Sequence, residues 1–224
     1  MSHIILENIS VNFPLDEQKN KSLRSQILKQ EFFENIQTNQ VNALKNINMN
    51  LEEGVYGVYG PNGSGKTTLL KVLAKIIYPS EGIVKINERI TSLTNIQYGF
   101  DDDLTGEENI ISQLLLDNIN IEDKEISKIV YKILTESKLG DYIYLPLKTY
   151  SSGMKFRLAF CLAMEKNGKI LILDEWISTA DKLFNEHVEL SLNNKINSSL
   201  VTVIASHNLE SSETVVQINT EDIR

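Results

Sequence analysis

The chain has 224 residues, an ordinary globular composition and a formal net charge of −8. This length suits one large or two small lobes around a sizeable core, and the negative charge is the opposite of what phosphate-backbone binding requires, so no nucleic-acid partner is predicted. Neither a run of eighteen apolar residues nor a secretory signal is visible, and the single cysteine, Cys161, lies in the apolar setting of a small buried hydrophobe.

Strand-like and helical patterns alternate along most of the chain. Strands are predicted at 3–13, 43–54, 54–60, 82–90, 169–175 and 199–206, and helical spacing at 23–32, 66–77 and over most of 105–166. The last two strands are short, continuous and rich in branched residues, which is typical of buried parallel strands. The order predicts an α/β core of strands and crossover helices with a helical insertion from about residue 100 to 165.

A phosphate cradle is predicted at "GPNGSGKTT", which fits the pattern G-x-x-x-x-G-K-[ST]. The glycines let the backbone bend so that amide N–H groups point at phosphate oxygens, and the following helix adds the positive end of its dipole. Lys66 is expected to reach the outer phosphates of ATP, and the Thr67 hydroxyl to bind Mg²⁺. The nucleotide-binding residues predicted here are Gly60, Pro61, Asn62, Gly63, Ser64, Gly65, Lys66, Thr67 and Thr68.

Two adjacent carboxylates end the apolar run "ILILDEW". Asp174 is expected to hold Mg²⁺, directly or through water, while Glu175 orients and polarises the attacking water; the alternative is a solvated strand end. The next apolar run, "VTVIASHNL", brings His207 about one strand–helix–strand unit later. We expect His207 to hydrogen-bond the terminal phosphate or the water, with a purely structural histidine as the alternative.

A polar turn, "YSSGM", opens another helical pattern. Ser151, Ser152 and the backbone amides around Gly153 form an anion-binding nest at a helix N-terminus. This turn belongs to the helical insertion, so its expected target is a phosphate held by a second copy, which predicts a homodimer with two ATP molecules at its interface. An ordinary helix cap is the alternative, and the pentapeptide alone does not decide between the two.

The ordered set "GPNGSGKTT", "YSSGM", "ILILDE", "STAD" and "SHNL" resembles the nucleotide-binding subunit of an ABC transporter over nearly the whole chain. The resemblance implies a single domain, residues 1–224. It would contain a P-loop NTPase α/β core with a mainly parallel sheet, an N-terminal antiparallel β region and a helical subdomain at about 105–166. The "YSSGM" turn corresponds to the family's signature loop, usually L-S-G-G-Q, from which Tyr150, Ser152 and Met154 depart.

The resemblance also implies roles for three residues outside these motifs. Asp181 matches the aspartate of the family's D-loop, which communicates between the two ATP sites. Phe13 matches the aromatic that stacks on adenine, with a strand-end core residue as the alternative. Gln97 lies close to the position of a glutamine that contacts Mg²⁺ and the membrane subunit, with spacing to "LTGEEN" shifted by about one residue.

Three stretches, "LPLKTYSSGMKFRLAF", "DEW" and "GFDDDLTGEENI", resemble the ATPases of polysaccharide exporters. This implies ATP hydrolysis that drives export of a polysaccharide or lipid-linked glycan across the bacterial inner membrane. The chain would lie at the cytoplasmic face, on two integral permease subunits that make most of the contact with the glycan. The alternatives are an exporter of another cargo (lipid, drug or ion), a soluble ABC-type ATPase, and a nucleotide-binding scaffold without turnover.

Two further segments carry expectations. The acidic triplet Asp101–Asp103 is expected either to receive a basic helix of the membrane partner or to be a solvated loop. The end of the chain, "SHNLESSETVVQINTEDIR", shows no recognisable further strand pair and no glycan-binding domain, so no selection of glycan length or cap is predicted for it.

Overall fold

The computed structural model describes residues 3–14, 40–94, 97, 99–117, 121–174, 182–205 and 214–217, with the backbone alone for 182–187 and 214–217. The helical pattern expected at 23–32 lies outside the described residues. The strands are β1 (Ile4–Pro14), β2 (Gln40–Leu51), β3 (Gly54–Tyr59), β4 (Glu81–Ile86), β5 (Ile90–Ser92), β6 (Ile170–Leu173), β7 (Val201–Ala205) and β8 (Thr214–Gln217). The helices are α2 (Lys66–Leu73), α3 (Gly106–Asp117), α4 (Asp123–Ser137), α5 (Ser152–Glu165) and α6 (Lys182–Ser198), with 3₁₀ turns η2 (Gly140–Tyr144) and η3 (Leu147–Thr149).

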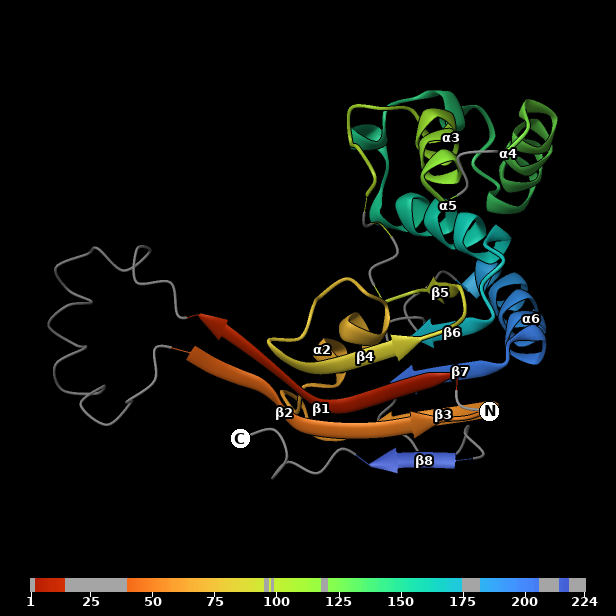
Figure 1. The fold of residues 1–224 in the computed structure, drawn as a ribbon. Coiled ribbons are helices and arrows are strands. Elements are labelled where there is room, and N and C mark those ends of the chain that lie inside the picture. Colours follow the sequence, from red (N-terminus) through yellow and green to blue (C-terminus); the bar gives the residue numbers. More distant parts are fainter. Residues whose placement is uncertain are drawn as a thin grey trace, which may run out of the picture.

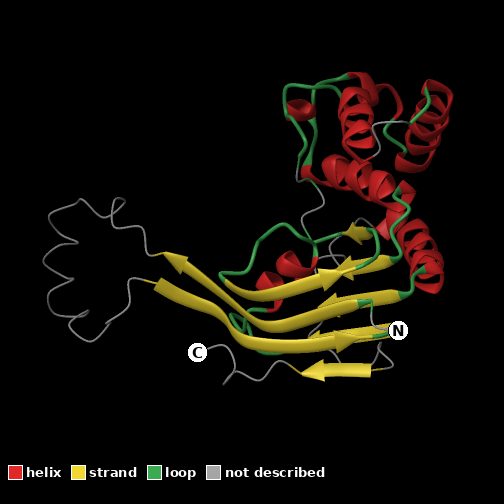
Figure 2. Ribbon diagram, viewed as in Figure 1, coloured by secondary structure: helices red, strands yellow, loops and turns green. Residues whose placement is uncertain are grey.

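The described chain forms two lobes (Figure 1). One lobe holds both sheets and α2, while α3, α4 and α5 gather in a separate helical lobe, so that strands and most helices occupy different regions (Figure 2). One sheet has the order β2-β1-β4 and is antiparallel; the other has the order β5-β6-β7-β3-β8 and its paired strands are parallel. The predicted α/β fold class, with its antiparallel region and helical insertion, is confirmed.

The parallel sheet brings the ends of distant segments to one edge. Ile170 of β6 pairs with Val201 of β7, and Val201 pairs with Gly54 of β3, so these strands begin level with one another. All four residues of β6 are buried, as expected for a strand that is covered on both faces. The carboxyl ends of parallel strands form the ligand crevice of open α/β sheets, and the glycine-rich loop and Asp174 both follow strands at this edge.

Alternation along β6 divides the interior into two cores. Ile170 and Ile172 pack in a cluster with the antiparallel sheet and α2, while Leu171 and Leu173 pack in a second cluster with α5 and the helical lobe. Side chains of a strand alternate between faces, so one short apolar segment serves both cores. This strand therefore joins the two lobes and positions Asp174 at their junction.

The structure differs from the predicted elements in three places. The strand expected at 82–90 is two strands, since β4 pairs with β1 while β5 pairs with β6 in the other sheet. The helix expected at 66–77 ends at Leu73, because Lys75 adopts a left-handed conformation (φ 58°), although Ile77 still packs against the core. A short strand, β8, runs parallel to β3 where no strand was expected.

The cysteine is expected to be unreactive in the folded protein. Cys161 has no exposed surface, and burial raises the pKa of its thiol to about 12. Thiolate is the reactive form, so at pH 8 the native chain should not react with a thiol-specific reagent, whereas the chain in denaturant should release one equivalent of chromophore. Rapid labelling of the native chain would contradict this burial.

Candidate nucleotide-binding site

The glycine-rich loop joins β3 to α2 and turns back sharply. Gly63 and Gly65 have φ of 80° and 88°, values that glycine adopts without strain. Gly65 is the N-cap of α2, and within the described part of the chain no side chain caps the helix. The N–H groups of the first helical turn have no intrahelical partners, so they provide donors for an anion where the loop meets the helix.

Two side chains of the loop fit a bound phosphate. The Lys66 ammonium donates to the carbonyl oxygens of Gly60, at 2.6 Å, and Pro61, at 3.1 Å, which folds the buried side chain back over the loop. The Ser64 hydroxyl is buried and has no hydrogen-bond partner among the residues that the structure describes. Thr67, in the first turn of α2, is exposed. A cation, an unsatisfied hydroxyl and a row of backbone donors are what a phosphate chain with its Mg²⁺ ion would use.

Asp174 follows β6 at the same edge of the sheet, with β7 between β6 and β3. Two strand spacings place the ends of β3 and β6 about 10 Å apart, a distance that a metal ion and a phosphate can bridge. Gln97 is exposed in the loop that leaves β5 at this edge, and its backbone carbonyl oxygen accepts the Phe100 N–H at 3.1 Å. Glu175, Asp181 and His207 lie outside the described residues, so their expected roles stay predictions.

The "YSSGM" stretch at 150–154, called the serine turn below, caps its helix, which was the ordinary alternative to anion binding. Ser151 is the N-cap of α5, and its hydroxyl oxygen accepts the Met154 N–H at 3.2 Å. Ser151 and Ser152 are exposed, and Gly153 is half-buried. Because the cap takes up the N–H of the third helical residue, the earlier amides of the first turn remain for an external anion. Capping and anion binding are thus compatible at this turn.

Phe13 lies near the end of β1, where it pairs with Val41 of β2. Its side chain is 41% exposed, so it is not the strand-end core residue that was the alternative to an adenine platform. An exposed aromatic ring is free to stack on a ligand, although its place against a nucleotide remains a prediction.

The structure explains why Tyr150 departs from the leucine that is common before the serine. Its ring is buried, its hydroxyl donates to the Tyr142 carbonyl oxygen at 2.6 Å, and burial raises its pKa to about 12. A Cβ on Gly106 would lie 2.4 Å from this hydroxyl, so a glycine at the start of α3 leaves room for the larger ring. The tyrosine and the glycine of "LTGEEN" are therefore matched to each other.

Sequence reasoning assigned no role to Asn109, which is buried and fixes the loop between Gln97 and α3. Its side-chain amide donates to the carbonyl oxygens of Asp101 (3.0 Å), Leu104 (3.3 Å) and Thr105 (2.9 Å), and its Oδ1 accepts the Asp101 N–H at 2.8 Å. Thr105 and Glu108 add a reciprocal cap, in which the Thr105 N–H donates to Glu108 and the Glu108 N–H donates to Thr105. The "LTGEEN" spacing of Thr and Glu is the sequence signal of this cap.

Replacing Asn109 with alanine should destabilise the fold by about 1–3 kcal/mol, because the buried side chain would lose its four hydrogen bonds to the loop and leave a small cavity. Urea unfolding followed by circular dichroism measures the change. The matched control is Asn87→Ala, at an exposed position in the β4–β5 turn, which should change stability by less than about 0.5 kcal/mol. Equal effects of the two substitutions would contradict the anchoring role of Asn109.

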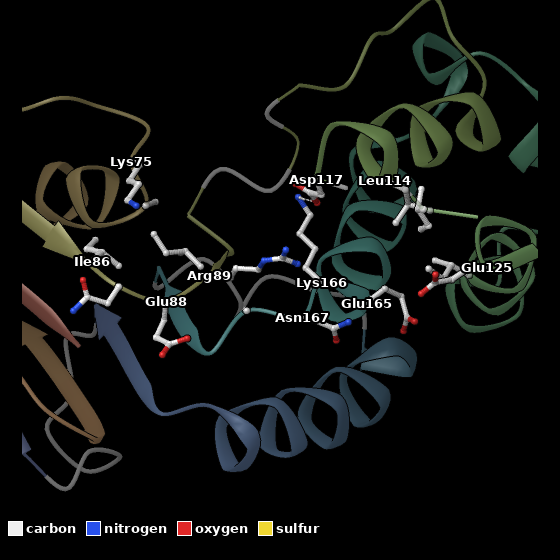
Figure 3. Close-up of a pocket in the computed structure, with 16 residues that line it drawn as sticks. Lys75, Ile86, Glu88, Arg89, Leu114, Asp117, Glu125, Glu165, Lys166 and Asn167 are labelled. Atoms are coloured by element: carbon white, nitrogen blue, oxygen red, sulfur yellow. Dashed lines mark ion pairs between the residues drawn. The ribbon is translucent and has the colours of Figure 1, made fainter. Parts of the chain in front are cut away.

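A cleft of about 620 Å³ separates the core from the helical lobe (Figure 3). Side chains from the end of α2, the β4–β5 turn and the ends of α3, α4 and α5 line it, and Lys166 crosses it to pair with Asp117 at 2.9 Å. Nearby, Lys132 pairs with Glu165 at 2.6 Å, and the Lys195 ammonium donates to the Lys166 carbonyl oxygen. The carboxyl end of α5 is thereby tied to α3, α4 and α6.

These features define a class of protein. A glycine-rich loop that runs into a helix at the carboxyl edge of a parallel sheet, with an aspartate two strands away, is the site of a P-loop nucleotide-binding protein. The family model described as ABC transporter matches residues 44–178, more than half of the chain. The chain therefore belongs to the ABC transporter family, and it is an ATPase.

Individual relatives agree with this assignment. The O-antigen export system ATP-binding protein RfbE of Yersinia enterocolitica is 34% identical over 213 residues, which cover 92% of this chain and 88% of RfbE. The teichoic acids export ATP-binding protein TagH of Shouchella clausii is 37% identical over 187 residues, 81% of this chain and 51% of TagH, so the chain spans about half the length of that relative. The dimeric ATP-binding cassette MJ0796, bound to ADP and phosphate, has the same fold, with a TM-score of 0.73, 20% identity and coverage of 98% of this chain and 96% of that one.

Proposed function

We propose that this chain, as a single ATP-binding domain spanning residues 1–224, powers export of a polysaccharide or lipid-linked glycan across the bacterial inner membrane. The observation that carries the proposal is the match to RfbE, which extends over most of both chains at 34% identity. The "YSSGM" and "LTGEEN" stretches, whose tyrosine and glycine pack together in this chain, add support because both stretches resemble the ATPases of polysaccharide exporters.

ATP would be held and cleaved mainly by positioning and electrostatics. Lys66 would leave the loop carbonyls that it now contacts and pair with the outer phosphates, beside the amides of the first turn of α2. Thr67 and Asp174, with Gln97, would hold Mg²⁺, which when bound neutralises phosphate charge. Glu175 would orient the attacking water and accept its proton, and His207 would donate to the terminal phosphate.

Each ATP would be completed by a second copy of the chain. The exposed serine turn at the start of α5 lies in the helical lobe, whereas the cradle belongs to the α/β lobe (Figure 1). In a head-to-tail homodimer, Ser151 and the amides around Gly153 of one subunit would bind the γ-phosphate held by the other. Asp181 would lie near this interface, and hydrolysis would remove the phosphate that joins the two chains.

The membrane-spanning part of such a machine would belong to other subunits. In the described residues, no helix combines the length and apolar character needed to cross a bilayer. We propose that the homodimer binds two permease subunits at the cytoplasmic face of the inner membrane, and that the glycan is contacted mainly through them. Cytoplasmic loops of membrane proteins are rich in Lys and Arg, which suits an acidic partner with a net charge of −8.

The cargo can be tested with the purified complex. The chain is isolated with the membrane protein that co-purifies with it, reconstituted in lipid vesicles, and assayed for phosphate release with a lipid-linked glycan or with the same lipid carrier lacking sugar. We expect stimulation by the glycan form alone. Stimulation by the bare lipid would indicate another cargo, and failure of any membrane protein to co-purify would contradict the exporter assignment.

A further inference from the structure

The loop after Gln97 lies against the segment that precedes the serine turn. The Leu147 N–H donates to the Leu104 carbonyl oxygen at 2.9 Å, and the Lys148 N–H donates to the Asp102 carbonyl oxygen at 2.9 Å. Thr105 and Pro146 form an isolated antiparallel bridge between the same two segments. The chain therefore makes a short two-stranded contact between the loop at 101–105 and the approach to α5.

Side-chain charges extend this contact to α5 itself. Asp102 pairs with Lys155, in the first turn of α5, at 2.5 Å, and Asp103 pairs with Lys148 at 2.9 Å. The two pairs differ in burial, since the Lys155 side chain is 21% exposed and the Lys148 side chain is 61% exposed. The acidic triplet is thus partly neutralised by lysines of its own chain, which neither of the two expectations for it had anticipated.

The more exposed pair, Asp103–Lys148, stays charged at neutral pH. The hydrogen bond from Lys148 lowers the pKa of Asp103, and the same contact raises the pKa of Lys148. Its contribution is lost as pH falls through the lowered Asp103 pKa or rises through the raised Lys148 pKa. Because both side chains are largely exposed, solvent screens this pair, and the more buried Asp102–Lys155 contact is the stronger candidate for holding the helix.

A lysine in the first turn of a helix opposes the helix dipole, because the positive end of the dipole lies there. The Asp102 carboxylate offsets that charge and, through the loop that Asn109 fixes, ties the first turn of α5 to α3. Ser151 caps this same turn and accepts the Lys155 N–H, so its hydroxyl and the neighbouring amides belong to the turn that Lys155 anchors. The Asp102–Lys155 contact thus connects the loop after Gln97 to the turn that would meet the ATP of the second subunit.

We propose that Asp102 is a positioning residue: through Lys155 it sets the orientation of the serine turn relative to the loop that follows Gln97. This inference rests on the proposed head-to-tail dimer. Asp102 does not touch nucleotide in this role. It aligns the donors of one subunit with the phosphate held by the other, so losing it should weaken dimerisation and leave nucleotide binding by the cradle intact.

The test compares Asp102→Asn, Lys155→Gln, the double variant and the conservative Asp102→Glu, each in the full chain. The first readout is the rate of hydrogen exchange, without nucleotide, of the Met154 and Lys155 amides, which donate to Ser151. The second is the ATP concentration that half-saturates dimerisation in a Glu175→Gln background. We expect the exchange rate and the ATP concentration each to rise about two- to fivefold in either single variant, with no further rise in the double variant. Asp102→Glu keeps a carboxylate at this position, so both readouts should stay close to their wild-type values.

Glu7→Gln is the matched control, because it removes one carboxylate from an exposed ion pair with Lys85 on the antiparallel sheet. Both readouts should stay at the wild-type value in this variant, and ATP binding by the single chain should be unchanged in all variants. Exchange in Asp102→Asn equal to that in Glu7→Gln, or raised exchange with an unchanged ATP requirement, would overturn the proposal. Absence of any ATP-dependent dimer in the parent protein would refute the proposed function instead, while the exchange readout would still decide whether Asp102 orders the turn.

Discussion

A Glu175→Gln chain should bind ATP and dimerise but release phosphate about 10²- to 10⁴-fold more slowly than the wild-type chain. General-base catalysis contributes about 10²- to 10⁴-fold in enzymes, and the amide keeps the shape of the carboxylate while losing its capacity to accept a proton. If Glu175 occupies its predicted place, the substitution also removes one negative charge near the phosphates, which favours retention of ATP. The expected product is a long-lived dimer that holds two nucleotides.

Phosphate release measures the loss of hydrolysis, and light scattering with and without MgATP measures dimerisation. Asp174→Asn is the informative comparison, because Asp174 directly precedes Glu175 at the sheet edge and is the expected metal ligand. Loss of the metal should abolish both hydrolysis and dimerisation, whereas loss of the base should abolish hydrolysis alone. Normal turnover by the Glu175→Gln chain would remove Glu175 from its role, and a strictly monomeric ATP complex would refute the shared site.

The parts of the site that the sequence predicts are those held by local chain geometry. The spacing of Gly60, Gly65 and Lys66 specifies a turn that runs into a helix, and the structure has such a turn between β3 and α2. The apolar run before Asp174 similarly predicts a buried strand, and parallel pairing then brings its end to the edge where the turn lies. Each of these inferences needs only contiguous residues and a rule of sheet topology.

Contacts between distant segments could not be predicted in this way. Asp102 and Lys155 are 53 residues apart, and the sequence contains no signal that pairs one carboxylate with one amine over that distance. Tyr150 and Gly106 are matched by packing between two segments, which a single sequence does not reveal. The prediction of one strand over 82–90 was wrong for a related reason. The polar turn at 87–89 contains no glycine or proline that would mark a break, and the pairing of β5 with β6 is a contact between distant segments.

A Lys66→Met chain should keep its fold and lose its response to nucleotide. Without a phosphate, the Lys66 ammonium is held by two loop carbonyls, so the buried cation contributes little net stability and methionine fills the space of its stem. We expect a melting temperature close to that of the wild-type chain when nucleotide is absent. We also expect hydrolysis to fall about 10²- to 10³-fold, because phosphate charge would lose its main side-chain partner.

Thermal unfolding with and without MgATP separates this role from a structural one. A ligand at a hundred times its dissociation constant stabilises the folded wild-type chain by about 2.7 kcal/mol, and most of this gain should be absent in Lys66→Met. The control is Lys71→Met, because Lys71 lies in the last turn of the same helix and should affect only its stability, by about 0.3–1 kcal/mol through the helix dipole. An undiminished MgATP shift in Lys66→Met would place the phosphates elsewhere, and since the Ser64 hydroxyl and the α2 amides would then also lack their expected ligand, it would contradict the whole cradle and not one residue of it.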